Sequence, residues 1–258
     1  MLGAITGDII GSVYEFTNVK PEFTFPLFVN DSEFTDDTVL TVALADSILN
    51  NFSYSEKLKE YYKKYPDAGY GGMFHSWART KNSNPYNSWG NGSAMRVSPV
   101  GWAYNDLETV LLKAKESAEV THNHPEGIKG AQATATSIFL ARTKHTKKEI
   151  KEFVEKNFDY KLDFEIEDLR KNYQFNESCQ NTVPQAIYTF LISENFEDSI
   201  RKAIYIGGDS DTLACINGSI AEAFYGGVPE DITKEIYKRM DNRITIITND
   251  FREKFITK

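Results

Sequence analysis

The sequence predicts an all-α protein, and three observations lead to this prediction. Apolar residues recur at intervals of three and four, which is the spacing of one helix face. Alternating segments typical of strands are missing. Glycine, asparagine and proline are concentrated at 67–72 and 81–92, which we expect to be loops, and a polar, aromatic insert at 159–181 is expected to be a further loop.

The helical pattern can be followed along the chain. Near the N-terminus, Gly3, Gly7 and Gly11 are spaced by four, which predicts a first helix that packs closely against a neighbour. Asp8 and Glu15 are seven residues apart and are expected to project from the same side of this helix. The later helices are predicted at 38–51, 107–118, 128–138, 183–191, 196–206, 212–225 and 230–241.

Length and composition are those of an ordinary globular protein. The 258 residues are 41% hydrophobic and 26% charged, enough to bury a sizeable core. No low-complexity linker and no repeat of solenoid period divides them. We therefore expect one multi-helix domain spanning residues 1–258.

The charge and the cysteines narrow the class of protein. A net charge of -8 argues against a general nucleic-acid binder. The two cysteines are too few for a disulfide framework, which fits a reducing compartment. The apolar N-terminus lacks a basic leader, and no window approaches a membrane span. We expect a cytoplasmic protein without a membrane partner.

Adjacent carboxylates and hydroxyls mark the predicted start of the helix at 38–51. Thr35, Asp36 and Asp37 come directly before its apolar residues. A Thr or Asp at this position caps exposed backbone donors, and the helix macrodipole favours negative charge in the first turn. Capping accounts for one or two of these side chains but does not require the whole run.

A second cluster of the same kind suggests a joint explanation. Asp209, Asp211 and Thr212 again stand directly before an apolar helix. Carboxylate and hydroxyl oxygens are ligands for hard cations such as Mg²⁺ or Mn²⁺, and two clusters brought together would hold two ions. The second cluster lacks the spacing of an EF-hand loop.

Five ordered motifs make a resemblance specific: "GDIIGSVYEF", "FTDDTVL", "WGNGSAMRVSPVG", "SAEVTHNHPEGIKGA" and "GGDSDTLACINGSIAEAFYG". They resemble the ADP-ribosylglycohydrolase family, which includes the dinitrogenase reductase-activating glycohydrolases, and they cover nearly the whole chain. The resemblance implies a compact all-helical domain with a binuclear Mg²⁺ or Mn²⁺ centre. It also implies cleavage of the glycosidic bond at the anomeric carbon of ADP-ribose.

The resemblance assigns roles to the acidic residues. It implies that six residues hold the metals: Thr35, Asp36, Asp37, Asp209, Asp211 and Thr212. Glu15 matches the family's acidic residue beside the metals, and we expect it to be the general acid/base, with Asp37 also part of the catalytic group. Without the resemblance, Glu15 would be interpreted as a solvated charge at a helix end.

The same resemblance implies a cradle for ADP-ribose. Its expected residues are Gly71, Gly72, Asn87, Ser88, Trp89, Gly90, Asn91, Gly92 and His122. Glycines in this loop permit close backbone approach to a pyrophosphate, and either Trp89 or Tyr86 is expected to stack on adenine. Without the resemblance, the loop could equally be an ordinary glycine and asparagine turn.

Other residues that suggest chemistry receive no active role. His122 and His124 lack a third ligand at a recognised spacing, so we do not predict zinc. His124 is expected to be structural, and Cys179 to be a small buried residue. Whether Arg96 pairs with a carboxylate stays undecided.

Three functions remain open. The first is a metal-dependent hydrolase that removes ADP-ribose from a modified protein or small molecule. The second is a catalytically silent ADP-ribose-binding or crystallin-like relative, against which the full set of metal donors argues. The third is a two-metal phosphatase or pyrophosphatase, which paired hard cations would also serve. The motifs do not distinguish arginine, serine or a small molecule as the acceptor.

Overall fold

The computed structural model describes residues 1–15 and 19–257, and within this part of the chain it contains helices and no strand. This confirms the all-α prediction. The helices are α1 Leu2–Gly11, α2 Asp36–Asn50, α3 Tyr54–Lys64, α4 Gly72–Arg79, α5 Gly92–Met95, α6 Ser98–Ala103, α7 Leu107–Glu119, α8 Pro125–Arg142, α9 Lys147–Phe158, α10 Ile166–Asn172, α11 Cys179–Leu191, α12 Phe196–Tyr205, α13 Ser210–Tyr225, α14 Glu230–Arg239 and α15 Asn242–Phe255.

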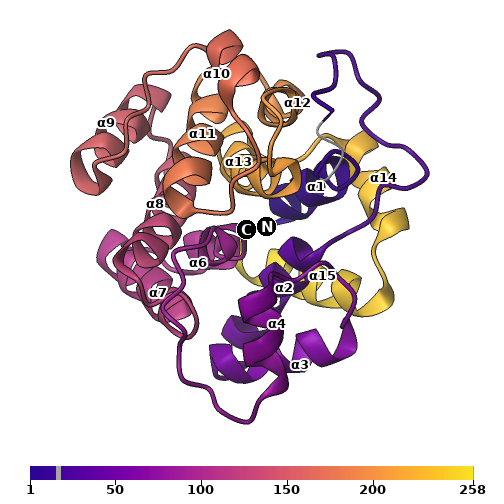
Figure 1. Cartoon of the computed structure of the whole chain (residues 1–258), viewed down its shortest axis with the longest axis vertical. Helices are drawn as coiled ribbons and strands as arrows, with labels where there is room; N and C mark the ends of the chain where they lie inside the picture. The colour runs from indigo at the N-terminus through magenta and orange to yellow at the C-terminus, as the bar shows by residue number, and fades with distance from the viewer. Residues whose placement is uncertain (16–18, 258) are drawn as a thin grey trace.

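Helix α13 lies at the centre of the fold. All its residues from Ser210 to Ala223 are buried, including polar ones such as Asn217 and Glu222. Helices α1, α8, α11 and α12 pack around it, as Figure 1 shows.

Helices α1 and α13 approach each other as closely as backbones allow. A Cβ atom added at Gly7 would lie 1.9 Å from the carbonyl oxygen of Ala214, and one at Gly3 would lie 2.1 Å from that of Gly218. Only glycine leaves room for this contact. The predicted close packing of the first helix is therefore confirmed.

Helix α1 ends earlier than expected. Its last residue is Gly11, and Glu15 follows in a turn. The prediction that Asp8 and Glu15 project from the same side of one helix is therefore wrong in its local structure. The two carboxyl groups still lie close enough for the charge of Asp8 to act on Glu15.

The insert at 159–181 is also more regular than predicted. Helix α10 forms inside it, and α11 begins before it ends. No residue of α10 is fully buried, and only Ile166 and Leu169 pack against the core, which is too short an apolar pattern to predict a helix. The loop prediction for this segment is wrong for these residues.

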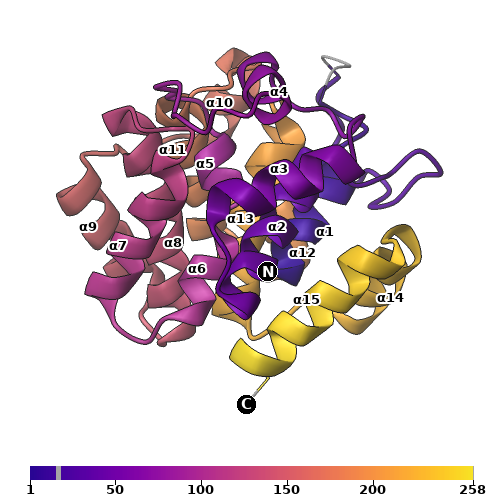
Figure 2. The same cartoon turned by 90° about the horizontal axis from the view of Figure 1, so that it is seen from below.

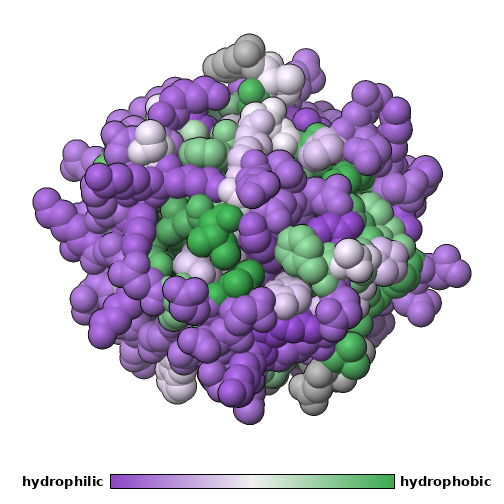
Figure 3. Space-filling view, turned by 90° about the horizontal axis from the view of Figure 1, so that it is seen from above, coloured by the Kyte–Doolittle hydropathy of each residue, from purple (hydrophilic) through white to green (hydrophobic). Residues whose placement is uncertain are grey.

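The C-terminal helices form one side of the molecule. Figure 2 shows α14 and α15 together, and α15 packs against α2. In the part of the chain that is described, no helix has the length and apolar character needed to cross a bilayer. The face in Figure 3 is mostly hydrophilic, with hydrophobic residues gathered in smaller patches.

Candidate active site

Asp8 of α1 holds the start of α2 in place. Its carboxylate accepts hydrogen bonds from the backbone N–H groups of Thr35 and Thr38, each at 3.0 Å, and from the Thr35 hydroxyl at 2.7 Å. Thr35 is the N-cap of α2, and its Oγ1 accepts a hydrogen bond from the Asp37 backbone at 3.3 Å. Asp8 thus fixes the orientation of Asp36 and Asp37.

The position of Asp8 within an apolar helix is a signal in the sequence from which this role could have been inferred. It is a fully buried carboxylate on an otherwise apolar helix. A buried charge of this kind requires partners. Its partners are the backbone donors of the next helix.

The start of α13 is fixed by a turn and by the glycine-rich loop. Gly207 and Gly208 have φ values of 75° and 85°, a conformation that favours glycine. Asp209 follows them, and its Oδ2 accepts a hydrogen bond from the side chain of Asn91 at 2.6 Å. Asn91 belongs to the loop before α5, so that loop is tied directly to the acidic cluster.

The two helix starts meet. The Thr212 hydroxyl donates to Asp37 Oδ1 at 3.4 Å, and Thr35 Oγ1 lies 3.4 Å from Asp211 Oδ2. The chain therefore brings together two acidic segments that are far apart in sequence.

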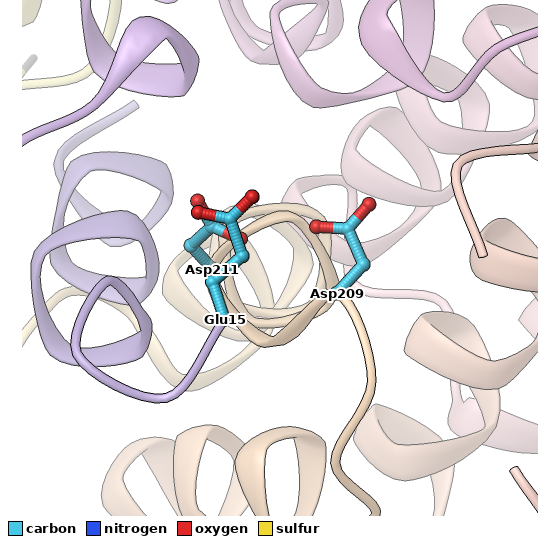
Figure 4. A group of neighbouring side chains, drawn as sticks. All are labelled: Glu15, Asp209 and Asp211. Atoms are coloured by element: carbon cyan, nitrogen blue, oxygen red, sulfur yellow. The ribbon is translucent and has the colours of Figure 1, made fainter. Parts of the chain in front are cut away.

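Glu15 completes the cluster. One carboxylate oxygen from each of Glu15, Asp209 and Asp211 lies within 4.8 Å of the others. Figure 4 shows these three carboxylates pointing toward the same side of the site. Oxygen atoms at this separation are close enough to share a bound cation.

The electrostatics of the cluster are unfavourable without a cation. Burial, together with neighbouring carboxylates, raises the pKa values of Asp37 and Asp211 well above their usual range. Burial and the charge of Asp209 raise the pKa of Glu15 to about 8. Among residues 1–15 and 19–257, no lysine or arginine forms an ion pair with these carboxylates.

One carboxylate oxygen of the cluster is suited to bind a cation. Asp37 is 2% exposed, and its Oδ2 is buried without a hydrogen-bond partner in the structure. A buried, unpaired carboxylate oxygen is costly unless a cation or donor reaches it. The donor set, all carboxylate and hydroxyl oxygens, fits a hard divalent cation.

A pocket of 360 Å³ opens above the cluster. Its lining includes Glu15, the carboxylates of both helix starts, the glycine-rich loop and the start of α4. Its walls include seven of the nine predicted ligand residues: Gly71, Gly72, Ser88, Gly90, Asn91, Gly92 and His122.

Two predicted ligand residues lie outside the pocket wall. Asn87 is exposed, with φ of 55°, and its backbone N–H donates to Asn123. Trp89 is 49% exposed, and its ring lies 5.6 Å from that of His124. Tyr86 does line the pocket, so of the two aromatic residues predicted to stack on adenine only Tyr86 is in place.

Comparison with known proteins agrees with this arrangement. The model of the ADP-ribosylglycohydrolase family matches residues 1–257. The chain belongs to the ADP-ribosylglycohydrolase family.

Individual relatives cover most of the chain. It is 27% identical to ADP-ribosylhydrolase ARH3 of Gallus gallus, over 88% of this chain and 84% of that protein. It is 23% identical to ADP-ribosylarginine hydrolase Tri1 of Pseudomonas putida, over 92% of this chain and 72% of that protein. A solved ADP-ribosylglycohydrolase-related protein complex has the same fold, with a TM-score of 0.73 at 21% identity, over 98% of this chain and 95% of that chain.

In this ADP-ribosylglycohydrolase family member, His122 is held by a short chain of hydrogen bonds. Arg96 donates to the Thr121 hydroxyl at 2.7 Å, and that hydroxyl lies 2.7 Å from His122 Nδ1. Because the hydroxyl already accepts from Arg96, it is suited to donate to Nδ1, which favours the tautomer with the proton on Nε2. Burial and the charge of Arg96 lower the pKa of His122 well below its usual value, so the ring is neutral.

Arg96 contributes a positive charge beneath the pocket. It is fully buried, and burial lowers its pKa to about 10. Its Nε and Nη1 atoms have no hydrogen-bond partner in the structure. Arg96 forms no ion pair with any described carboxylate, which answers the question left by the sequence.

The glycine-rich loop of this family member is fastened to the start of α11. Cys179 is buried, its backbone N–H donates to Trp89 O at 3.0 Å, and its thiol donates to Gly90 O at 3.1 Å. Burial raises the pKa of this thiol to about 12. Cys179 is therefore an unreactive residue that positions the loop.

The sequence did not predict every residue of the pocket wall, and Phe175 and Glu177 are among those not predicted. Both residues come from the segment between α10 and α11 and line the pocket beside the acidic cluster. Nothing in their sequence context distinguishes them from other residues of a polar loop. His124, in contrast, is structural as predicted, because it caps α8 by accepting from the Glu126 backbone.

Proposed function

We propose that this chain is a divalent-metal-dependent ADP-ribosylhydrolase that cleaves the glycosidic bond between ADP-ribose and a modified acceptor. The observation that carries the proposal is the meeting of two acidic helix starts beneath a pocket walled by a glycine-rich loop. Membership of the ADP-ribosylglycohydrolase family supports it. So do two relatives, which are an ADP-ribosylhydrolase and an ADP-ribosylarginine hydrolase.

Thr35, Asp36 and Asp37 from one helix start and Asp209, Asp211 and Thr212 from the other would hold two Mg²⁺ or Mn²⁺ ions. The unpaired oxygen of Asp37 and the unneutralised charge of the cluster support this assignment. Bound there, the ions would polarise ribose hydroxyls and stabilise charge in the transition state. Asp37 accepts from the Thr212 hydroxyl of the other helix start, and we place it in the catalytic group.

Glu15 is placed to move the proton. It lines the pocket together with the carboxylates of both helix starts. Its carboxyl group can hold a proton and give it to a leaving group. The departing acceptor leaves an oxocarbenium-like sugar, which the surrounding carboxylates stabilise until a water molecule adds to the anomeric carbon and loses its proton to a carboxylate.

The pocket wall around His122 is suited to the pyrophosphate. The neutral His122 ring presents Nε2 toward Gly92, where a Cβ atom would lie only 3.1 Å away. A donor on Nε2 and the buried charge of Arg96 both favour an anion here. Tyr86 supplies an aromatic face for the base.

A panel of modified substrates tests the proposal. The protein is incubated with Mg²⁺ or Mn²⁺ and with peptides that carry ADP-ribose on arginine or on serine, and products are separated by chromatography. Release of ADP-ribose that stops with a chelator supports the proposal. Release of AMP would instead indicate a two-metal pyrophosphatase, and binding without any product would indicate a silent relative.

A further inference from the structure

The segment between α10 and α11 presents Glu177 to the pocket in a fixed position. The Glu177 carbonyl accepts from the Asn91 backbone at 2.7 Å, and the next residue, Ser178, forms an antiparallel bridge with Gly90. On the other side, Asn176 accepts from the Ser178 backbone at 2.9 Å. The glycine-rich loop and the wall that carries Glu177 are therefore joined by backbone hydrogen bonds.

Glu177 is not part of the metal cluster. The carboxylates whose oxygens lie within 4.8 Å of one another are those of Glu15, Asp209 and Asp211. Glu177 lines the same pocket, and its side chain is exposed to solvent there. Its carboxylate is thus free to face a ligand rather than an ion held between the helix starts.

The charge of Glu177 acts on carboxyl groups of the acidic cluster. Burial is the main cause of the raised pKa values of Glu15 and Asp209, and Glu177 adds to both. No described lysine or arginine forms an ion pair with Glu177. An acceptor that covers this wall without a positive charge would desolvate a carboxylate beside other carboxylates.

An aromatic side chain lines the same pocket as this carboxylate. Phe175 precedes Glu177 by two residues in the same segment and is 39% exposed. A carboxylate next to an aromatic face is the combination that recognises a guanidinium, by paired hydrogen bonds and by cation–π contact. A serine hydroxyl would use neither feature.

Resting on the proposed function, we propose that Glu177, assisted by Phe175, selects a guanidinium as the leaving group. The preferred substrate is then ADP-ribose linked to arginine or to a small guanidine compound. Glu177 acts as a specificity-determining residue, and Glu15 and the metal cluster treat all ADP-ribosylated substrates alike.

The test compares Glu177→Gln with the unchanged protein on three substrates: an ADP-ribosylarginine peptide, ADP-ribosylagmatine and an ADP-ribosylserine peptide. We expect kcat/KM for both guanidinium substrates to fall about tenfold, the loss of one charge-assisted hydrogen bond, and kcat/KM for the serine peptide to stay within about twofold. The ratio of kcat/KM for the two guanidinium substrates shows whether the preferred leaving group is a protein side chain or a small compound. The matched control is Glu253→Gln, an exposed glutamate on α15, which should change none of the three.

Equal losses on all substrates, or no loss on the guanidinium substrates, would overturn the role of Glu177. A preference of the unchanged protein for the serine peptide would overturn it as well.

A binding measurement separates this inference from the proposed function. Dissociation constants of the three ligands are measured in Glu15→Gln protein, with and without Glu177→Gln, by calorimetry. Tighter binding of the guanidinium ligands that disappears with Glu177→Gln supports the inference even if the unchanged protein turns over nothing. In that case the proposed hydrolase function would be wrong, and the role of Glu177 in binding would stand. Equal binding of guanidinium and serine ligands would overturn the inference whatever the turnover.

Discussion

At the scale of single residues, Asp8 and Glu15 show how one acidic sequence motif serves two purposes. Asp8 is fully buried, and its oxygens are occupied by donors from the start of α2. Glu15 is partly exposed and faces the pocket. Asp8 is therefore a positioning residue, and Glu15 is the residue available for proton transfer.

We expect Glu15→Gln to lower kcat on an ADP-ribosylated peptide by at least about a hundredfold, because an amide cannot donate or accept the proton. Affinity for Mn²⁺, measured by calorimetry, should change much less, since the carboxylates of both helix starts remain. Glu33→Gln, at an exposed glutamate outside the pocket wall, is the control and should leave kcat unchanged. Full activity of Glu15→Gln would remove this residue from the mechanism.

The candidate site could be predicted from the sequence where its residues stand in contiguous motifs. Thr35 to Asp37 and Asp209 to Thr212 each carry their donors side by side at a helix start, so a local pattern reveals them. Glu177 and the link from Arg96 through Thr121 depend on contacts between distant segments. No local pattern encodes such contacts.

At the scale of helices, the contact between α1 and α13 sets the position of the whole cluster. Helix α1 carries Asp8, and α13 begins with the second acidic group. Their closest approach is at Gly7, so any added atom there must push the two helices apart.

We expect Gly7→Ala to lower the free energy of unfolding by about 3 kcal/mol, because the new methyl group overlaps backbone atoms that cannot move independently. Urea denaturation measures this loss, and Mn²⁺ affinity should fall as well, since the helix starts are displaced. Gly72→Ala is the matched control, because a Cβ atom there meets nothing within 4 Å. Equal stability of the two variants would show that the close approach has no structural importance.

The apolar spacing of the sequence predicted most of the longer helices. The helices predicted at 38–51, 107–118, 128–138, 183–191, 196–206, 212–225 and 230–241 correspond to α2, α7, α8, α11, α12, α13 and α14. Helices α3, α9 and α15 were missed, although each buries three or four residues and the predicted helix α14 buries two. Tertiary contacts select these helices more than local pattern does.

At the scale of the whole molecule, the fold brings several buried carboxyl groups together in one cluster. Carboxyl groups whose pKa values are raised on folding stabilise the fold while they are protonated, and this contribution is lost as the pH rises through their folded-state pKa values. For Glu15, this stabilising contribution is lost as the pH rises from the usual pKa of 4.5 to the folded-state pKa of about 8. A cation bound among the carboxylates removes the repulsion.

We therefore expect the melting temperature of metal-free protein to fall between about pH 5 and about pH 8 through this cluster. Adding Mg²⁺ or Mn²⁺ should raise it more at the higher pH, because more carboxylates are then ionised. Differential scanning fluorimetry with and without a chelator measures both effects. Asp37→Asn should weaken the metal effect, and an equal metal effect at both pH values would contradict this account.

The central claim is that the starts of α2 and α13 jointly bind divalent cations beneath the ADP-ribose pocket. Anomalous diffraction from crystals grown with Mn²⁺ and ADP-ribose tests it most directly, because it locates the metal without reference to the protein atoms. The account predicts anomalous peaks between Asp36 and Asp37 on one side and Asp209 and Asp211 on the other, with the ribose above them. Manganese bound only elsewhere, or none between these residues while ADP-ribose occupies the pocket, would contradict it.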